Sequence, residues 1–151
     1  MSLSRRGPSH ESGFVKGVAT SKPKILVIDD DPRLAELLRF TLAKANFYEA
    51  FAETRPRNAL GAVRAIRPDL ILLDVEMPGM SGGEVAKALA ADPALCSIPI
   101  LFVTSLVSKG DSGSRRFRRG NHFYLPKMVE PNALIGAVEE MLAERQEVIR
   151  Q

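Results

Sequence analysis

The stretch Lys24–Pro32, KILVIDDDP, decides the fold class of this chain. Four consecutive aliphatic side chains follow the lysine, which is typical of a strand buried on both faces. Three aspartates and a proline come next, so that Asp31 can cap a helix and Pro32 can occupy its first position. Apolar side chains at helical spacing then continue to about Lys44. This unit predicts a parallel α/β sheet.

The same alternation of short apolar runs and helical periods continues to the C-terminus, and we predict a doubly wound α/β fold with a five-stranded parallel sheet. The interval 106–121 holds Gly110 and Gly113 where a covering helix is expected, so a short or frayed helix is predicted there. After the first unit, the predicted elements are a strand at 47–52, a helix at 58–66, a central strand at 70–73, a helix at 84–91, strands at 98–104 and 123–126, and a helix from 131 to about 148.

Length and composition place the chain among globular proteins of one domain, because 151 residues with 45% hydrophobic side chains suffice for one core. We expect residues 1–23 to be a flexible tail and 24–151 the domain. Residues 1–24 carry a net charge of +4, so the remainder is close to neutral and nucleic acid is not an expected partner. Cys96 is the only cysteine and no apolar run approaches ~20 residues, so a cytoplasmic protein without membrane insertion is expected.

Functional residue types follow the predicted strands at their carboxyl ends, where parallel α/β sheets place their sites. Asp29 and Asp30 follow the first strand, Asp74 the third, Thr104 the fourth and Lys127 the fifth. Three carboxylates in one cleft raise each other's pKa unless a cation intervenes. Because only oxygen ligands are at hand, Mg²⁺ is expected, with Mn²⁺ as the alternative. A lysine and a hydroxyl beside the metal point to phosphoryl transfer to or from a carboxylate.

Four motifs in this order resemble the receiver domain of two-component response regulators, of the single-domain chemotaxis type. They are KILVIDDDP, LILLDVEMPGMSG with Asp74, LFVTS with Thr104 and FYLPK with Lys127. The resemblance covers about 24–147. It implies a flavodoxin-like fold with strand order 2-1-3-4-5.

The resemblance also implies a role for each site residue. Asp74 would accept a phosphoryl group from a histidine kinase or a phosphotransfer protein. Lys127 and Thr104 would contact phosphoryl oxygens, so the protein need only position and stabilise the transferring group. The implied metal ligands are Asp30 directly, Asp29 through water, Asp74, and the backbone carbonyl of Glu76.

A switch is implied as well, in which Thr104 moves toward the phosphoryl group and Tyr124 moves inward. This would reshape the face made by the fourth helix, the fifth strand and the closing helix, where a downstream protein would bind. The chain is then a phosphoacceptor of a two-component system or phosphorelay, without a DNA-binding output domain. It would not be an enzyme beyond its own phosphorylation and autodephosphorylation, and a homodimer remains open.

Two features depart from the receiver pattern. Receivers usually place proline directly after the lysine, with a cis bond that aims it, whereas here Pro126 precedes Lys127 and Met128 follows. Either the loop holds a cis bond without proline or the lysine is aimed differently. Glu76 adds a carboxylate two residues after Asp74, and we expect it to alter the autodephosphorylation rate.

Three other functions were weighed against the receiver. A degenerate receiver that takes no phosphate is favoured by the Met128 departure. A phosphohydrolase of the haloacid dehalogenase type would use Asp74 with Glu76 as the second acid, although the chain leaves little length for a cap. A dinucleotide-binding domain is excluded because aspartates, and no glycine-rich turn, follow the first strand.

The run Arg115–Arg119, RRFRR, holds four arginines around one aromatic residue. It allows three interpretations: a solvated basic loop, a docking patch for an acidic partner surface, or a contact with nucleic acid.

Overall fold

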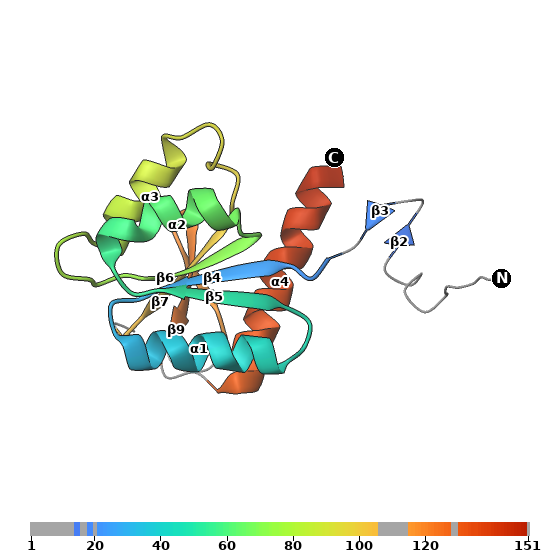
Figure 1. Ribbon diagram of the computed structural model, residues 1–151, viewed down its shortest axis with the longest axis horizontal. Coiled ribbons are helices and arrows are strands. Elements are labelled where there is room, and N and C mark those ends of the chain that lie inside the picture. The colour runs from blue at the N-terminus through green and yellow to red at the C-terminus, as the bar shows by residue number, and fades with distance from the viewer. Residues whose placement is uncertain (1–13, 16–17, 20, 106–114, 128–129, 151) are drawn as a thin grey trace.

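The computed structural model describes residues 14–15, 18–19, 21–105, 115–127 and 130–150 (Figure 1). Within these ranges, no helix is long and apolar enough to cross a membrane. In the predicted tail, β2 (Phe14–Val15) and β3 (Val18–Ala19) form a short antiparallel pair that the sequence did not indicate. The division of the chain into tail and domain stays a prediction.

A six-stranded sheet forms the centre of the fold, with the order β5-β4-β6-β7-β9-β8. The first five strands in that order are parallel, and they have the predicted order 2-1-3-4-5. The doubly wound fold class is therefore confirmed, with one strand more than predicted. The strands are β4 (Lys24–Ile28), β5 (Glu49–Glu53), β6 (Leu70–Asp74), β7 (Ile100–Thr104), β8 (Phe117–Arg119) and β9 (His122–Pro126).

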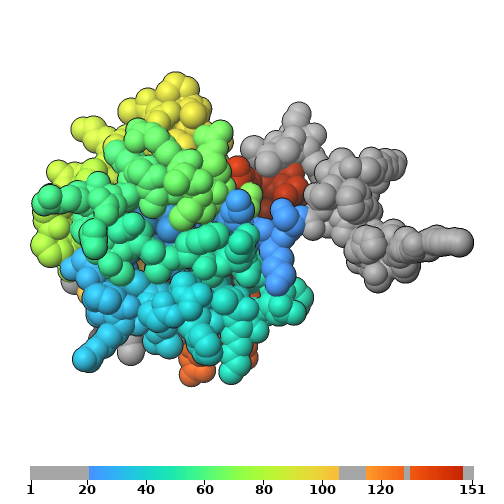
Figure 2. All heavy atoms as spheres, in the orientation of Figure 1, coloured from blue at the N-terminus to red at the C-terminus, as the bar shows by residue number. Residues whose placement is uncertain are grey.

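Helices cover both faces of the sheet, and each face has its own apolar core (Figure 1). Alternate residues of the central strands face opposite layers: Leu70 and Leu72 pack toward α1 and α4, whereas Ile71 and Leu73 pack toward α2 and α3. Figure 2 shows atoms of α1, in blue to cyan, and of α2, in green, on the face toward the viewer. The helices are α1 (Pro32–Lys44), α2 (Ala59–Ile66) after the 3₁₀ turn η2 (Pro56–Asn58), α3 (Gly82–Ala90) and α4 (Pro131–Arg150).

The turns that follow β4 and β6 are set by helix caps. Asp31 caps α1 through its side chain, which accepts hydrogen bonds from the first-turn N–H groups, and Pro32 opens the helix as predicted. Ser81 and Glu84 form a reciprocal capping box at the start of α3, so this helix begins two residues earlier than predicted. Both helices therefore start beside the carboxyl ends of the strands that they follow.

The predicted helix within 106–121 is wrong for the part that the structure describes. Residues 117–119 form β8, which pairs antiparallel with β9 through a two-residue turn at Gly120 and Asn121. Gly120 has φ +61°, which glycine adopts without strain at the first position of a type II′ hairpin turn. Phe117 stacks on Tyr124 across the pair and anchors the strand. Residues 106–114 lie outside the described part of the chain.

Because β8 covers one side of β9, the fifth parallel strand is not at the edge of the sheet, where the implied order 2-1-3-4-5 would place it. Pro126 interrupts no pairing with β8, because β8 pairs with residues 122–124 and Pro126 lies beyond the end of this antiparallel ladder. Its position is paired in register only with Thr104 of β7. Two strands begin two residues later than predicted. The second parallel strand spans 49–53 and the fourth spans 100–104.

Candidate functional site

Three aspartates from two adjacent strands meet at the carboxyl edge of the sheet. Asp29 and Asp30 follow β4, and Asp74 ends β6; each offers a carboxylate oxygen, and these oxygens lie within 4.8 Å of one another. Asp29 is 1% exposed and Asp74 2% exposed. Because β4 and β6 are parallel neighbours in register, the sheet brings the two buried carboxylates together.

The two carboxylate oxygens of Asp74 differ in their contacts. Its Oδ1 accepts a hydrogen bond from the backbone N–H of Glu76 at 3.3 Å and faces the Lys127 ammonium at 3.2 Å. Its Oδ2 is buried and has no hydrogen-bond partner among the described residues. The position of α3 depends on close contact here, since a Cβ on Gly82 would lie 2.2 Å from the Asp74 carbonyl oxygen. Glycine is therefore required at the start of α3.

Asp29 shows the same division between its two oxygens. Oδ1 accepts a hydrogen bond from the backbone N–H of Asp31 at 2.9 Å. Oδ2 is buried and has no hydrogen-bond partner among the described residues; the Lys127 ammonium lies 3.7 Å away, beyond hydrogen-bonding distance. Two buried carboxylate oxygens of one cluster thus have no hydrogen-bond partner among the described residues.

Lys127 supplies the cation that the structure places against this cluster. Its backbone N–H donates to the Thr104 carbonyl at 2.9 Å, which holds the residue beside β7. Its side chain reaches both Asp29 and Asp74. The lysine is therefore aimed at the acidic cluster without a following proline. Met128 lies outside the described residues, so the question of a cis bond stays open.

Burial dominates the electrostatics of the site. It raises the pKa of the Asp29 carboxyl from 3.8 to about 6, with the charge of Asp74 adding to the rise and the Asp31 N–H and Lys127 opposing it. Burial also raises the pKa of Asp74, although Lys127 opposes this rise. For Lys127, burial favours the neutral amine, but the Asp29 and Asp74 charges outweigh it and raise its pKa. The carboxylates of the cluster carry more negative charge than the one positive charge of Lys127 balances.

This donor set fits a magnesium ion. Mg²⁺ binds one or two carboxylates in an all-oxygen shell that it completes with water. The two oxygens without a hydrogen bond, Asp29 Oδ2 and Asp74 Oδ2, are the buried polar atoms that such an ion would satisfy. A divalent cation would also offset the burial and the mutual repulsion that raise the carboxyl pKa values.

The remaining predicted site residues lie around the cluster. Thr104 is buried at the end of β7, one residue beyond the partner of Asp74 in the register. Glu76 is exposed, and its backbone N–H points to Asp74. Tyr124 is half-buried, and its ring stacks between Phe102 at 5.1 Å and Phe117 at 5.7 Å. The sequence did not indicate this aromatic stack, because a helix is predicted within 106–121 and Phe117 stands among arginines without the alternation typical of a strand.

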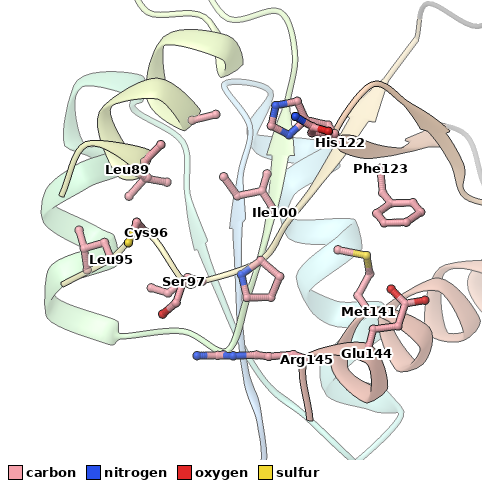
Figure 3. A pocket seen from close by; sticks show the side chains of 15 residues that line it. Leu89, Leu95, Cys96, Ser97, Ile100, His122, Phe123, Met141, Glu144 and Arg145 are labelled. Carbon is pink, nitrogen blue, oxygen red and sulfur yellow. The ribbon is translucent and has the colours of Figure 1, made fainter. Parts of the chain in front are cut away.

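An apolar cavity of about 390 Å³ lies where the parallel strands β7 and β9 begin, away from their carboxyl ends (Figure 3). Ile100 and His122, which begin β7 and β9, line it together with Leu89 of α3 and Met141 of α4. The acidic cluster lies at the other ends of the strands. This cavity is therefore separate from the candidate site.

Comparison with known proteins agrees with this geometry. Residues 25–139 match the response regulator receiver domain family. The chain is 35% identical over 123 residues to the polar-differentiation response regulator DivK of Brucella anthropi, covering 81% of this chain and 98% of that protein. It is 37% identical over 123 residues to the DNA-binding response regulator MtrA of Mycolicibacterium smegmatis, covering 82% of this chain and 52% of that protein. The chain thus spans about half the length of the MtrA relatives.

A solved structure shows the same fold. The chemotaxis protein CheY4 of Vibrio cholerae superimposes with a TM-score of 0.66 at 27% identity, covering 80% of this chain and 99% of that one. The sheet order, the acidic cluster at its carboxyl edge and the sequence match all lead to the same family. This chain belongs to the response regulator receiver domain family.

Proposed function

We propose that this chain is a phosphoacceptor module of a two-component system or phosphorelay, in which Asp74 receives a phosphoryl group from a histidine kinase or phosphotransfer protein. The observation that carries the proposal is the unpaired Oδ2 of Asp74, buried beside two carboxylates and a lysine. In the transfer, Asp74 Oδ2 forms a bond to phosphorus as the bond from phosphorus to the histidine nitrogen breaks. The leaving imidazole takes up a proton.

Each neighbour has a role in this proposal. Asp30 and Asp29 would hold Mg²⁺ with Asp74 and the Glu76 carbonyl, and the bound ion would supply positive charge to the phosphoryl oxygens. The Lys127 ammonium, 3.2 Å from Asp74 Oδ1, would pair with a phosphoryl oxygen.

Thr104 and Tyr124 would form the switch, and the structure adds a consequence. Tyr124 stacks on Phe117, so any movement of its ring disturbs the packing of β8. The surface altered by phosphorylation would then include β8, β9 and α4. Hydrogen exchange of the β8 amides with and without acetyl phosphate tests this: a change in the wild type that persists in Tyr124→Phe and disappears in Tyr124→Ala supports the switch. A change that persists in Tyr124→Ala contradicts it.

A turnover assay separates the phosphoacceptor from a phosphohydrolase with the same nucleophile. Phosphate release is measured with Mg²⁺ from acetyl phosphate and from p-nitrophenyl phosphate, a stable monoester. We expect slow release from acetyl phosphate that requires Asp74, and no turnover of the monoester. Glu49→Gln, which neutralises an exposed carboxylate on β5, should behave as the wild type. Many turnovers of the monoester would favour the hydrolase.

A further inference from the structure

Within the described residues, no strand pairs with the outer side of β8. It is the last strand in the order β5-β4-β6-β7-β9-β8, and its one partner there is β9. The pair Arg119–His122 flanks the two-residue turn, and in such a ladder hydrogen-bonded and non-hydrogen-bonded pairs alternate. The next pair is Arg118–Phe123, so the N–H and C=O groups of Arg118 face away from β9. The outer edge of β8 can therefore accept another strand.

The arginines of β8 and of the two positions just before it make different contacts. The side chain of Arg116 is 13% exposed and is anchored by Glu140, at 2.8 Å, and by Glu144. Arg115 and Arg118 are exposed and form no ion pair with a carboxylate of the described residues; Arg118 donates to the Gly120 carbonyl at 2.9 Å. Two guanidinium groups, one on β8 and one just before it, thus have no acidic partner within the described part of the chain. A segment that added to this edge would meet positive charge.

Space for side chains lies next to this edge. A groove of about 330 Å³ runs between the start of β8 and α4, with Arg115 on one side and the small residues Ala133, Gly136 and Ala137 on the other. A strand added along β8 would direct every second side chain toward this face of the sheet.

We propose that the open edge of β8 binds an extended acidic segment of a partner protein, which adds to the sheet as a seventh strand and pairs its carboxylates with Arg115 and Arg118. A second copy of this chain fits less well, because its β8 would set arginines against arginines. Nucleic acid also fits less well. The Phe117 ring lies between Tyr124 and the Arg119 guanidinium, and Phe123 packs beneath Arg116 and Arg118, so these rings are not open to stacked bases.

Peptide binding to the full chain, without phosphodonor, tests this inference independently of the phosphoacceptor function. The probe is a fluorescein-labelled peptide of about eight alternating glutamates and valines, the length of a long strand, followed by fluorescence anisotropy. The variant is Arg115→Glu/Arg118→Glu. The matched control, Arg57→Glu/Arg64→Glu, makes the same change in net charge on η2 and α2.

We expect the arginine-edge variant to bind the peptide at least about tenfold more weakly than the wild type, with the control variant unchanged and added salt weakening binding. The same peptide with alternate backbone amides N-methylated, so that they cannot pair with a strand edge, should also lose about tenfold or more. Equal binding by both charge-reversal variants, or by both peptides, would overturn the proposal.

Two further outcomes would also overturn it. Tighter binding of a single-stranded oligonucleotide than of the acidic peptide would assign the edge to nucleic acid. Absence of peptide binding to the wild type, together with self-association of Arg115→Glu/Arg118→Glu in sedimentation, would mean that the arginines protect the edge from aggregation.

Discussion

Replacing Asp29 with asparagine should stabilise the metal-free protein, although it damages the site. At neutral pH the folded protein carries this carboxylate ionised at 1% exposure. A rise in its pKa from 3.8 to about 6 corresponds to about 3 kcal/mol of destabilisation, which sets the upper limit of the gain. Asparagine keeps the acceptor for the Asp31 N–H but loses the attraction of Lys127. We therefore expect Asp29→Asn to raise the free energy of unfolding by about 1–3 kcal/mol.

The sign of the pH dependence follows from the same shift. A carboxyl whose pKa is raised in the folded state favours folding below pH 3.8, and this contribution is lost as the pH rises through about 6. The gain in the free energy of unfolding from Asp29→Asn should therefore reach its full size at pH 7.5 and be about half as large at pH 5.

Urea denaturation followed by far-UV circular dichroism measures this prediction, in EDTA at both pH values. Glu49→Gln is the control and should change stability by less than about 0.5 kcal/mol, because its carboxyl is exposed. Adding Mg²⁺ should stabilise the wild type more than Asp29→Asn, since the ion neutralises the buried charge that the substitution removes. Equal or lower stability of Asp29→Asn in EDTA at pH 7.5, or a gain independent of pH, would refute the reasoning.

Three further sets of substitutions test other parts of the account. Lys127→Ala should slow phosphorylation by acetyl phosphate about tenfold or more while Mg²⁺ binding, measured by calorimetry, persists; an unchanged rate would remove the lysine from the site. Gly82→Ala should lower the free energy of unfolding by about 2 kcal/mol or more, because its Cβ meets the backbone at 2.2 Å, whereas Gly83→Ala, with 3.8 Å of room, should be neutral or slightly stabilising. Arg116→Ala should destabilise the fold by about 1–3 kcal/mol and Arg118→Ala by under about 0.5 kcal/mol in thermal denaturation, and equal effects would contradict the anchoring role of Arg116.

The central part of the fold could be predicted from the sequence because its signals are local and agree with one another. The aliphatic run 25–28 and the run 70–73 are long enough to indicate strands buried on both faces, and both are buried in the sheet. Asp31 and Pro32 marked the start of α1 through cap chemistry. Strand order came from the family resemblance, since parallel pairing joins residues far apart in sequence.

The β8 hairpin could not be predicted in the same way. Its strand has three residues, too few for a clear alternation, and its stability comes from Phe117 packing on Tyr124 and from Arg116 contacting α4. These contacts are tertiary, so local propensity does not reveal them. Local propensity marks Gly110 and Gly113 as unfavourable in a helix, but it does not reveal that Gly120, with its positive φ, makes the hairpin turn.

The candidate site was predictable in its residue types and less so in its geometry. The rule that parallel strands end at a common edge indicated that Asp29, Asp30 and Asp74 meet, and they lie within reach of one metal ion. The sequence did not determine where the Lys127 ammonium lies, because the residue after it departs from the receiver pattern. Its ammonium position depends on the end of β9 and on the backbone bond to Thr104, which only the folded chain defines.

Intact-mass spectrometry tests the central claim most directly. The protein is incubated with acetyl phosphate, with Mg²⁺ or with EDTA, beside Asp74→Asn and the control Glu49→Gln. We predict an added mass of about 80 Da, one phosphoryl group, in the wild type and in the control, only when Mg²⁺ is present and never in Asp74→Asn. An adduct that persists in Asp74→Asn, or no adduct in a wild type that still binds Mg²⁺, would contradict Asp74 as the phosphoacceptor.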